Sequence, residues 1–152
     1  MKLTFDNFCD KIVEINLKAV KESTNKTLFT IVTYKNNKPT IHPFFYTDGS
    51  PMDYAQKVID KETPEMYCIV SEAWVKIMPI SESSEYEKNY KWGDMQKDPA
   101  KKECLFFLGK TMDGTKTYSR TFIIYRKKSG ITLEELKDKV GSKPTLKSTK
   151  LK

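Results

Sequence analysis

Residues 66–78 read MYCIVSEAWVKIM, the longest strand-like stretch in this chain of 152 residues. Side chains alternate between the two faces of a strand. One face carries Ile69, Ser71, Ala73, Val75 and Ile77, and the other carries Cys68, Val70, Glu72, Trp74 and Lys76. We therefore predict a long strand that holds a carboxylate, Glu72, between hydrophobic neighbours.

A hairpin is predicted on the N-terminal side of this strand. Residues 28–35 and 40–46 are rich in β-branched and aromatic side chains, and the turn-forming residues 36–38 lie between them. Pro43 cannot donate a hydrogen bond to a neighbouring strand, so the second of these strands is predicted to lie at an edge or to carry a bulge.

A second hairpin is predicted on the C-terminal side. Residues 103–110 and 118–126 form the strands, and Asp113-Gly114 between them is the strongest turn signal in the chain. This register places Phe107 opposite Arg120 and Leu105 opposite Phe122.

Three helices are predicted from capping signals and from hydrophobic spacing. The first runs from Thr4, its N-cap, to about Glu22, and the second begins after Ser50-Pro51 and ends at Thr63-Pro64. The third is short: Thr132 and Glu135 form a capping box at its start, and it stops at Gly141. The apolar stripe of the first helix consists of Phe5, Phe8, Ile12, Ile15 and Ala19, widened by Val13 and Val20.

The order of these elements predicts an α+β fold in a single domain over residues 1–141. Hairpins outnumber parallel crossovers, so we expect an antiparallel sheet of about five strands with helices mainly on one face. Residues 142–152 hold four lysines and no acidic residue, and we predict that they form a disordered basic tail.

The charge is concentrated at the C-terminus. The whole chain has a net charge of +7, and Arg126–Lys152 alone contains nine basic and three acidic residues. This pattern permits weak, non-specific nucleic-acid binding through the C-terminal lysines. However, 25 of the 27 basic residues are lysine, and arginine is the preferred residue for base and bidentate phosphate contacts. Solubility is therefore the simpler interpretation of the charge.

The cysteines and the N-terminus predict a cytoplasmic protein without a membrane anchor. Cys9, Cys68 and Cys104 are far apart and lie in apolar segments, as buried thiols do in a reducing compartment. Residues 1–6 lack the apolar stretch of a signal peptide. No apolar run approaches the roughly 20 residues that span a bilayer.

Two motifs that often carry chemistry are weak here, and we predict neither a metal nor a cofactor. Gly109-Lys110-Thr111 matches the end of a phosphate-binding loop, but Cys104 occupies the position of the earlier glycine and a hairpin follows instead of a helix. His42 is the only histidine, and its place before a proline in an aromatic strand favours packing over general-base catalysis.

The carboxylate of Glu72 leaves two hypotheses open. An ionised group on a buried strand face needs a partner, and Arg120 in the second hairpin could supply it. Alternatively, Glu72 and Glu103, with His42 or a tyrosine, could form a catalytic site under the long loop of residues 79–102.

The loop of residues 79–102 carries three large aromatic side chains, Tyr86, Tyr90 and Trp92, among lysines. Such residues either anchor a loop on its own domain or contact a partner, and base stacking is one form of that contact. We predict that the loop is ordered at these rings. Together with Trp74 and Arg120, they are the candidate binding residues.

Ser71-Glu72-Ala73-Trp74 and the later run from Asp98-Pro99 to Glu103 carry a resemblance. This part of the chain resembles small uncharacterised prokaryotic and phage-type proteins that have a Ser-Glu-Ala-Trp strand followed by an Asp-Pro-x-x-x-Glu run. Here the second motif has one extra residue. The resemblance implies an accessory role and no known activity.

These observations lead to one main functional hypothesis and two alternatives. The main hypothesis is a non-enzymatic intracellular binding or accessory protein with a protein partner, of phage or mobile-element origin. The alternatives are a small enzyme that uses Glu72 and Glu103, and weak nucleic-acid binding by the C-terminal tail.

Overall fold

The computed structural model divides the chain into two compact units. The first unit comprises Met1–Ser71 and Phe106–Arg120, and the second comprises Glu72–Leu105 and Thr121–Lys152. The structure describes residues 3–22, 29–44, 50–79, 85, 88–89, 91, 97–136 and 142–147.

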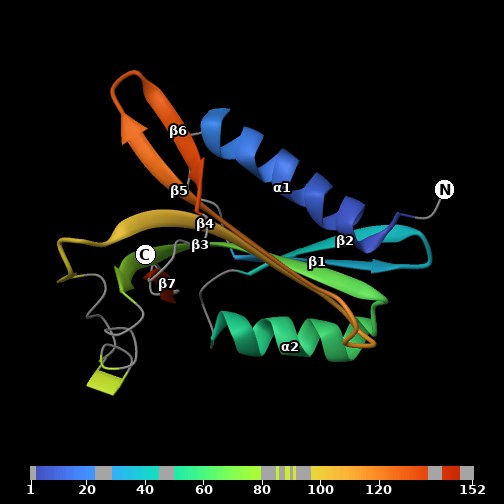
Figure 1. The fold of residues 1–152 in the computed structure, drawn as a ribbon. Coiled ribbons are helices and arrows are strands. Elements are labelled where there is room, and N and C mark those ends of the chain that lie inside the picture. Colours follow the sequence, from blue (N-terminus) through green and yellow to red (C-terminus); the bar gives the residue numbers. More distant parts are fainter. Residues whose placement is uncertain are drawn as a thin grey trace. The chain divides into compact units, whose positions relative to one another are not determined.

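The fold is α+β with an antiparallel sheet, as the sequence predicted (Figure 1). The strand order is β2-β1-β3-β4-β5-β6, with β7 paired to β3, so the sheet has more strands than the expected five. The elements are α1 (Phe5–Glu22), β1 (Thr30–Lys35), β2 (Lys38–Pro43), α2 (Pro51–Glu62), β3 (Met66–Pro79), β4 (Lys102–Thr111), β5 (Thr117–Lys127), β6 (Gly130–Glu135) and β7 (Ser142–Lys147).

In the first unit, α2 packs on one face of the sheet. Ile31 of β1 lies beside Ile69 of β3, and both side chains are buried against α2. In the same cluster the rings of Phe29 and Phe44 pack edge to face, with their centroids 6.1 Å apart. The buried members are Phe29, Ile31, Phe44, Ala55, Val58, Ile59 and Ile69.

Helix α1 packs on the opposite face of this part of the sheet (Figure 1). The Phe8 ring of α1 lies 5.5 Å from the ring of Tyr34, whose neighbours along β1 point to the α2 face. The sequence predicted both helices mainly on one face. In the structure the two helices lie on opposite faces. Strand β1 has buried side chains on both faces, so a helix packs on each of them.

Gly109 permits close approach between α1 and β4 within the first unit. A Cβ atom added at Gly109 would lie 2.7 Å from the Sγ atom of Cys9 and 3.2 Å from the Phe5 ring. Glycine is therefore required here for packing. The phosphate-loop interpretation of residues 109–111 fails, because Gly109 is buried in a strand.

The buried stripe of α1 differs slightly from the predicted stripe. Ile15 is 59% exposed and Ala19 is also exposed, although both were expected to face the core. Cys9, which the predicted stripe did not include, is fully buried. The stripe that packs on the sheet is Phe5, Phe8, Cys9, Ile12, Val13 and Val20.

The local signals for helix starts and turns are confirmed. Thr4 accepts a hydrogen bond from the N–H of Asn7 at 3.2 Å, and Ser50 caps α2 in the same way. Asn36 and Asn37 both have positive φ, which is the geometry of a two-residue hairpin turn. Thr63 ends α2 in the left-handed conformation.

Strand β2 is an edge strand, as Pro43 indicated. The N–H of Phe44 donates to the carbonyl of Phe29 at 2.8 Å, so by alternation the backbone groups of Pro39, Ile41 and Pro43 face away from β1. Two of these three residues have no N–H. This composition protects the edge from pairing with another strand.

The C-terminal predictions need two corrections, both in the second unit. The short helix predicted from Thr132 and Glu135 is instead strand β6, which pairs with β5. Residues 142–147, predicted to be disordered, form β7 and pair with residues 74–79 of β3. In both cases pairing with a neighbouring strand prevails over the local sequence signal. For β6, exposed and half-buried residues alternate with a period of two, which is the pattern of a strand.

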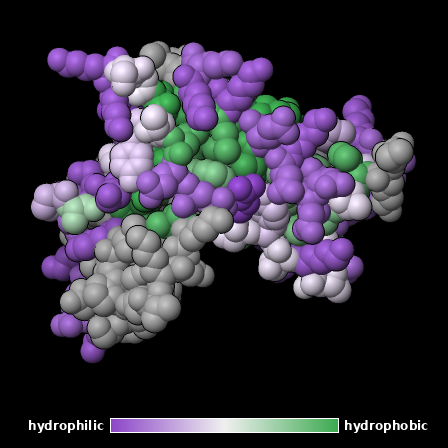
Figure 2. Space-filling view, turned by 45° about the horizontal axis from the view of Figure 1, so that its top comes forward, coloured by the Kyte–Doolittle hydropathy of each residue, from purple (hydrophilic) through white to green (hydrophobic). Residues whose placement is uncertain are grey.

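The face of the molecule drawn in Figure 2 is mostly polar where it is described. Figure 2 shows hydrophilic residues over most of the visible face, with hydrophobic residues gathered between them. The large hydrophobic residues exposed in the described ranges are Ile15, Ile41, Met52, Leu108 and Met112.

Candidate functional site

An ion-paired cluster in the second unit contains two of the predicted site residues. The Nε atom of Arg126 on β5 donates to Glu103 of β4 at 2.8 Å, and its Nη2 atom donates to Glu72 of β3 at 3.2 Å. The Glu72 side chain is 4% exposed, whereas that of Arg126 is 34% exposed. The arginine thus joins two carboxylates from neighbouring strands.

A second set of polar contacts lies nearby along β3. Lys76 donates to Asp98 at 2.7 Å, and the N–H of Ala100 donates to the same carboxylate at 2.8 Å. The Lys76 hydrogen bond, followed by that of Ala100, lowers the pKa of Asp98 below its usual value. The ammonium of Lys101 lies 5.0 Å from the ring centroid of Trp74, a cation–π contact.

A hollow of about 480 Å³ adjoins the arginine cluster. Tyr125 is half-buried in its lining, and the ammonium of Lys102 lies 5.7 Å from the centroid of the Tyr125 ring. The hollow combines a buried aliphatic side chain, Ile123, with positive charges. Its lining residues are Lys102, Glu103, Ile123, Ile124, Tyr125, Arg126 and Lys127.

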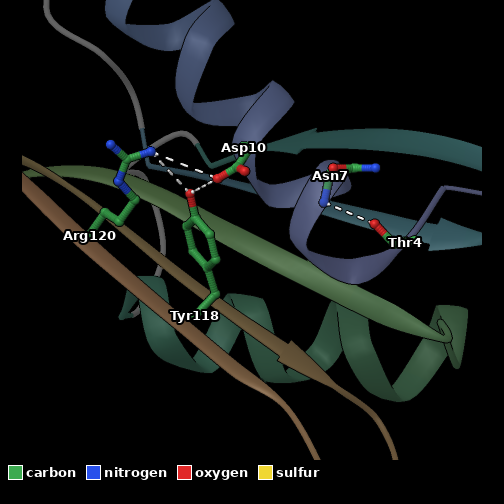
Figure 3. A network of polar contacts seen from close by, with 5 residues as sticks. All are labelled: Thr4, Asn7, Asp10, Tyr118 and Arg120. Carbon is green, nitrogen blue, oxygen red and sulfur yellow. Dashed lines mark hydrogen bonds and ion pairs between the residues drawn. The ribbon is translucent and has the colours of Figure 1, made fainter.

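Arg120, a predicted binding residue, belongs to a surface network in the first unit (Figure 3). The hydroxyl of Tyr118 donates to Asp10 of α1 at 2.6 Å. Arg120 donates to the Tyr118 hydroxyl at 3.4 Å and forms an ion pair with Asp10 at 3.8 Å. Burial and the Asp10 hydrogen bond raise the pKa of Tyr118 to about 12. The network links α1 to β5.

A hollow of about 590 Å³ lies at the turn between β4 and β5 in the first unit. Asp113 in this turn accepts hydrogen bonds from the hydroxyls of Thr111 and Thr115, each at 2.7 Å. The hydrogen bond from the backbone N–H of Thr115, followed by those from the two hydroxyls, lowers the pKa of Asp113 to about 2. The carboxylate closes the turn by binding its own neighbours, so it has a structural role.

The three cysteines are buried free thiols, as the sequence predicted. A hydrogen bond with Cys9 and burial raise the pKa of the Cys68 thiol. A thiol is a poor nucleophile, because the thiolate is the reactive form. All three side chains are fully buried, so they pack as small hydrophobic groups.

The remaining predicted site residues are distributed between the units. His42 lies in the first unit on β2, where its Nε2 atom is 3.1 Å from the Thr33 hydroxyl. Glu72 and Arg120 belong to different units, so their pairing stays a prediction. The aromatic residues of the long loop, Tyr86, Tyr90 and Trp92, lie outside the described residues.

Arg126, which bonds to both carboxylates of the cluster, was not among the predicted site residues. A signal was available, because Arg126 is one of only two arginines in the chain. The register set by the Asp113-Gly114 turn places Arg126 opposite position 101 and therefore diagonal to Glu103, within reach of a long side chain. The contacts of Lys76 with Asp98 and of Lys101 with Trp74 had no comparable signal.

Metal-binding clusters and membrane-spanning helices can be assessed for the described part of the chain. Among those residues, no group of three or more histidine, cysteine or acidic side chains is placed to hold a metal ion. No helix within the same ranges has the length and apolar character needed to cross a membrane.

Comparison with models of known protein families, with curated proteins and with solved structures finds no match to this chain.

Proposed function

We propose that this protein acts by binding a partner rather than by catalysis, as a cytoplasmic accessory protein whose contact surface lies on the second unit. The bonding of one guanidinium, that of Arg126, to both Glu72 and Glu103 carries this proposal. A guanidinium forms charge-assisted hydrogen bonds with carboxylates, and these are stronger than bonds between neutral groups. Two carboxylates in this arrangement support the sheet.

The alternative, a carboxylate enzyme, requires different surroundings. A general acid or base must exchange a proton with a substrate, so its carboxyl group has to lie open to a groove. The Glu72 side chain is almost fully buried. The partner that the structure describes for it is the guanidinium of Arg126 on β5. The buried free thiols are consistent with the proposed reducing compartment.

A double-mutant cycle on Glu72 and Arg126 tests the proposal. Arg126→Met removes the described cation from the buried Glu72 carboxylate and should lower the free energy of unfolding by about 3 kcal/mol. Glu72→Gln leaves the partly exposed Arg126 bonded to Glu103 and should cost only about 1 kcal/mol. The double variant should be less destabilised than the sum of the two. Thermal and denaturant unfolding measure these differences.

Glu134→Gln is the matched control, because Glu134 is an exposed carboxylate on β6. It should change stability by less than about 0.5 kcal/mol. If Glu72→Gln leaves stability unchanged or raises it, Glu72 is a destabilising carboxylate of the kind placed for chemistry. That result would replace the binding proposal with the enzyme.

A further inference from the structure

One sheet surface of the second unit has an aromatic ring between two lysines. Tyr125 lies opposite Thr132 of β6, and Lys127 lies opposite Gly130. Alternation along β5 places Lys127 on the same face as Tyr125 and Arg126 on the other. Lys102 of β4 approaches the same ring, at 5.7 Å. The ring borders a hollow of about 480 Å³ that residues of β4 and β5 line.

The charge of this unit suits an anionic partner. The second unit contains 15 basic and 10 acidic residues, so it carries +5 of the chain's net +7. Lys102 and Lys127 at the hollow are exposed, and so is Lys128 in the following turn. Two carboxylates are close: Glu103 is bonded to Arg126, and Glu134 lies opposite Ile123 on the Tyr125 face.

We propose that this surface, defined by Tyr125, Lys102 and Lys127, binds single-stranded nucleic acid; the inference rests on the proposed binding function and names the partner class. A base stacks on the Tyr125 ring and displaces the Lys102 ammonium, which then contacts a backbone phosphate. Lys127 contacts a second phosphate. Stacking of bases on exposed rings beside a positive track is the common mode of single-strand binding.

The same residues define the expected specificity. A lysine ammonium contacts a phosphate as a point charge, whereas bidentate reading of a base edge requires a guanidinium or an amide. Arg126, the arginine of this unit, bonds to carboxylates on the opposite face. Binding should therefore be nearly independent of sequence, and it should prefer single strands because a duplex hides the faces of its bases.

Fluorescence anisotropy with the full chain and a labelled oligothymidylate of about 12 nucleotides tests this surface. Tyr125→Leu should weaken binding by about 5- to 100-fold through lost stacking, while Tyr125→Phe should retain binding. Lys102→Gln with Lys127→Gln should reduce the slope of log K against log salt by about 1.4. The matched control is Lys57→Gln with Lys110→Gln in the first unit. It should reduce the steepness of the salt dependence less than the Lys102/Lys127 variant does.

Several outcomes would overturn the proposal. These are equal binding of duplex DNA or polyglutamate, unchanged affinity of folded Tyr125→Leu, or loss of binding only when residues 148–152 are deleted. If Tyr125→Leu does not fold, the salt slope of the lysine pair decides. Failure to bind the oligothymidylate while Glu72 and Arg126 remain energetically coupled refutes the nucleic-acid partner alone. Loss of that coupling refutes the binding function.

Discussion

The two halves of β3 belong to different units and are stabilised differently. In residues 66–71 both faces are apolar or small, and Cys68, Ile69 and Val70 are almost fully buried. In residues 72–76 one face still buries Ala73 and Val75, but the other carries Glu72, Trp74 and Lys76 with their charged partners. A single strand can thus depend on helix packing at one end and on ion pairs at the other.

The comparison predicts the largest loss of stability for a truncation in the first half. Ile69→Ala removes a side chain buried in the cluster beneath α2 and should cost about 3 to 4 kcal/mol, within the range of about 2 to 5 kcal/mol for buried Ile→Ala changes. Ile41→Ala on the exposed edge strand is the matched control and should cost less than about 0.5 kcal/mol. Equal losses in denaturant unfolding would show that burial does not distinguish the two sites.

The next largest effect should come from crowding the face that α1 covers. Gly109→Ala places a methyl group 2.7 Å from the Cys9 sulfur and should cost about 2 kcal/mol through overpacking. In Cys9→Ala the sulfur is absent, so the same Gly109→Ala change should cost less. Additive losses in thermal melts would mean that the helix does not approach β4 at this point.

The second half of β3 should respond weakly to loss of one ion pair. Lys76→Met removes the partner of Asp98 and should cost about 1 kcal/mol at neutral pH. The pKa of Asp98 is lowered in the folded state, so this stabilisation is present above the unfolded pKa, near 4, and is lost as pH falls through the folded value. Variant and wild type should therefore converge in acid, as chemical denaturation at several pH values can measure.

The smallest effect is expected for Tyr118 in the first unit, and it appears at the opposite end of the pH scale. Its folded pKa is raised to about 12, so its contribution is present below pH 10 and is lost as pH rises from 10 to 12. Tyr118→Phe should cost under about 1 kcal/mol at pH 7, because the lost hydrogen bond lies at the surface. If the free energy of unfolding of Tyr118→Phe falls above pH 10 as much as that of the wild type, the alkaline loss of stability belongs to another group.

The features predicted correctly are those encoded within a few residues. Thr4 and Ser50 start helices by binding nearby N–H groups, and Asn36-Asn37 forms a tight turn whatever surrounds it. The features that differed depend on distant segments. Thr132 and Glu135 are a sound local capping pattern, yet pairing with β5 offers this segment more hydrogen bonds than a short helix could.

The candidate site shows the same division. The sequence identified Glu72 as a buried carboxylate that requires a partner, because its strand neighbours are hydrophobic. It did not identify Arg126 as that partner, since the choice among cations 30 to 60 residues away depends on the register of two further strands. The sequence thus predicts that Glu72 needs a cationic partner, but it does not predict that Arg126 is one.

The sequence by itself determined the α+β class, the long central strand, the helix caps, the edge strand and the burial of the cysteines. Each follows from period, turn chemistry or the missing N–H of proline, which act over short distances along the chain. Only the tertiary structure decided that α1 and α2 cover opposite faces, that Arg126 joins Glu72 to Glu103, and that residues 130–135 and 142–147 are strands. These depend on pairings between distant segments, whose free energy is gained only when both partners are already in place.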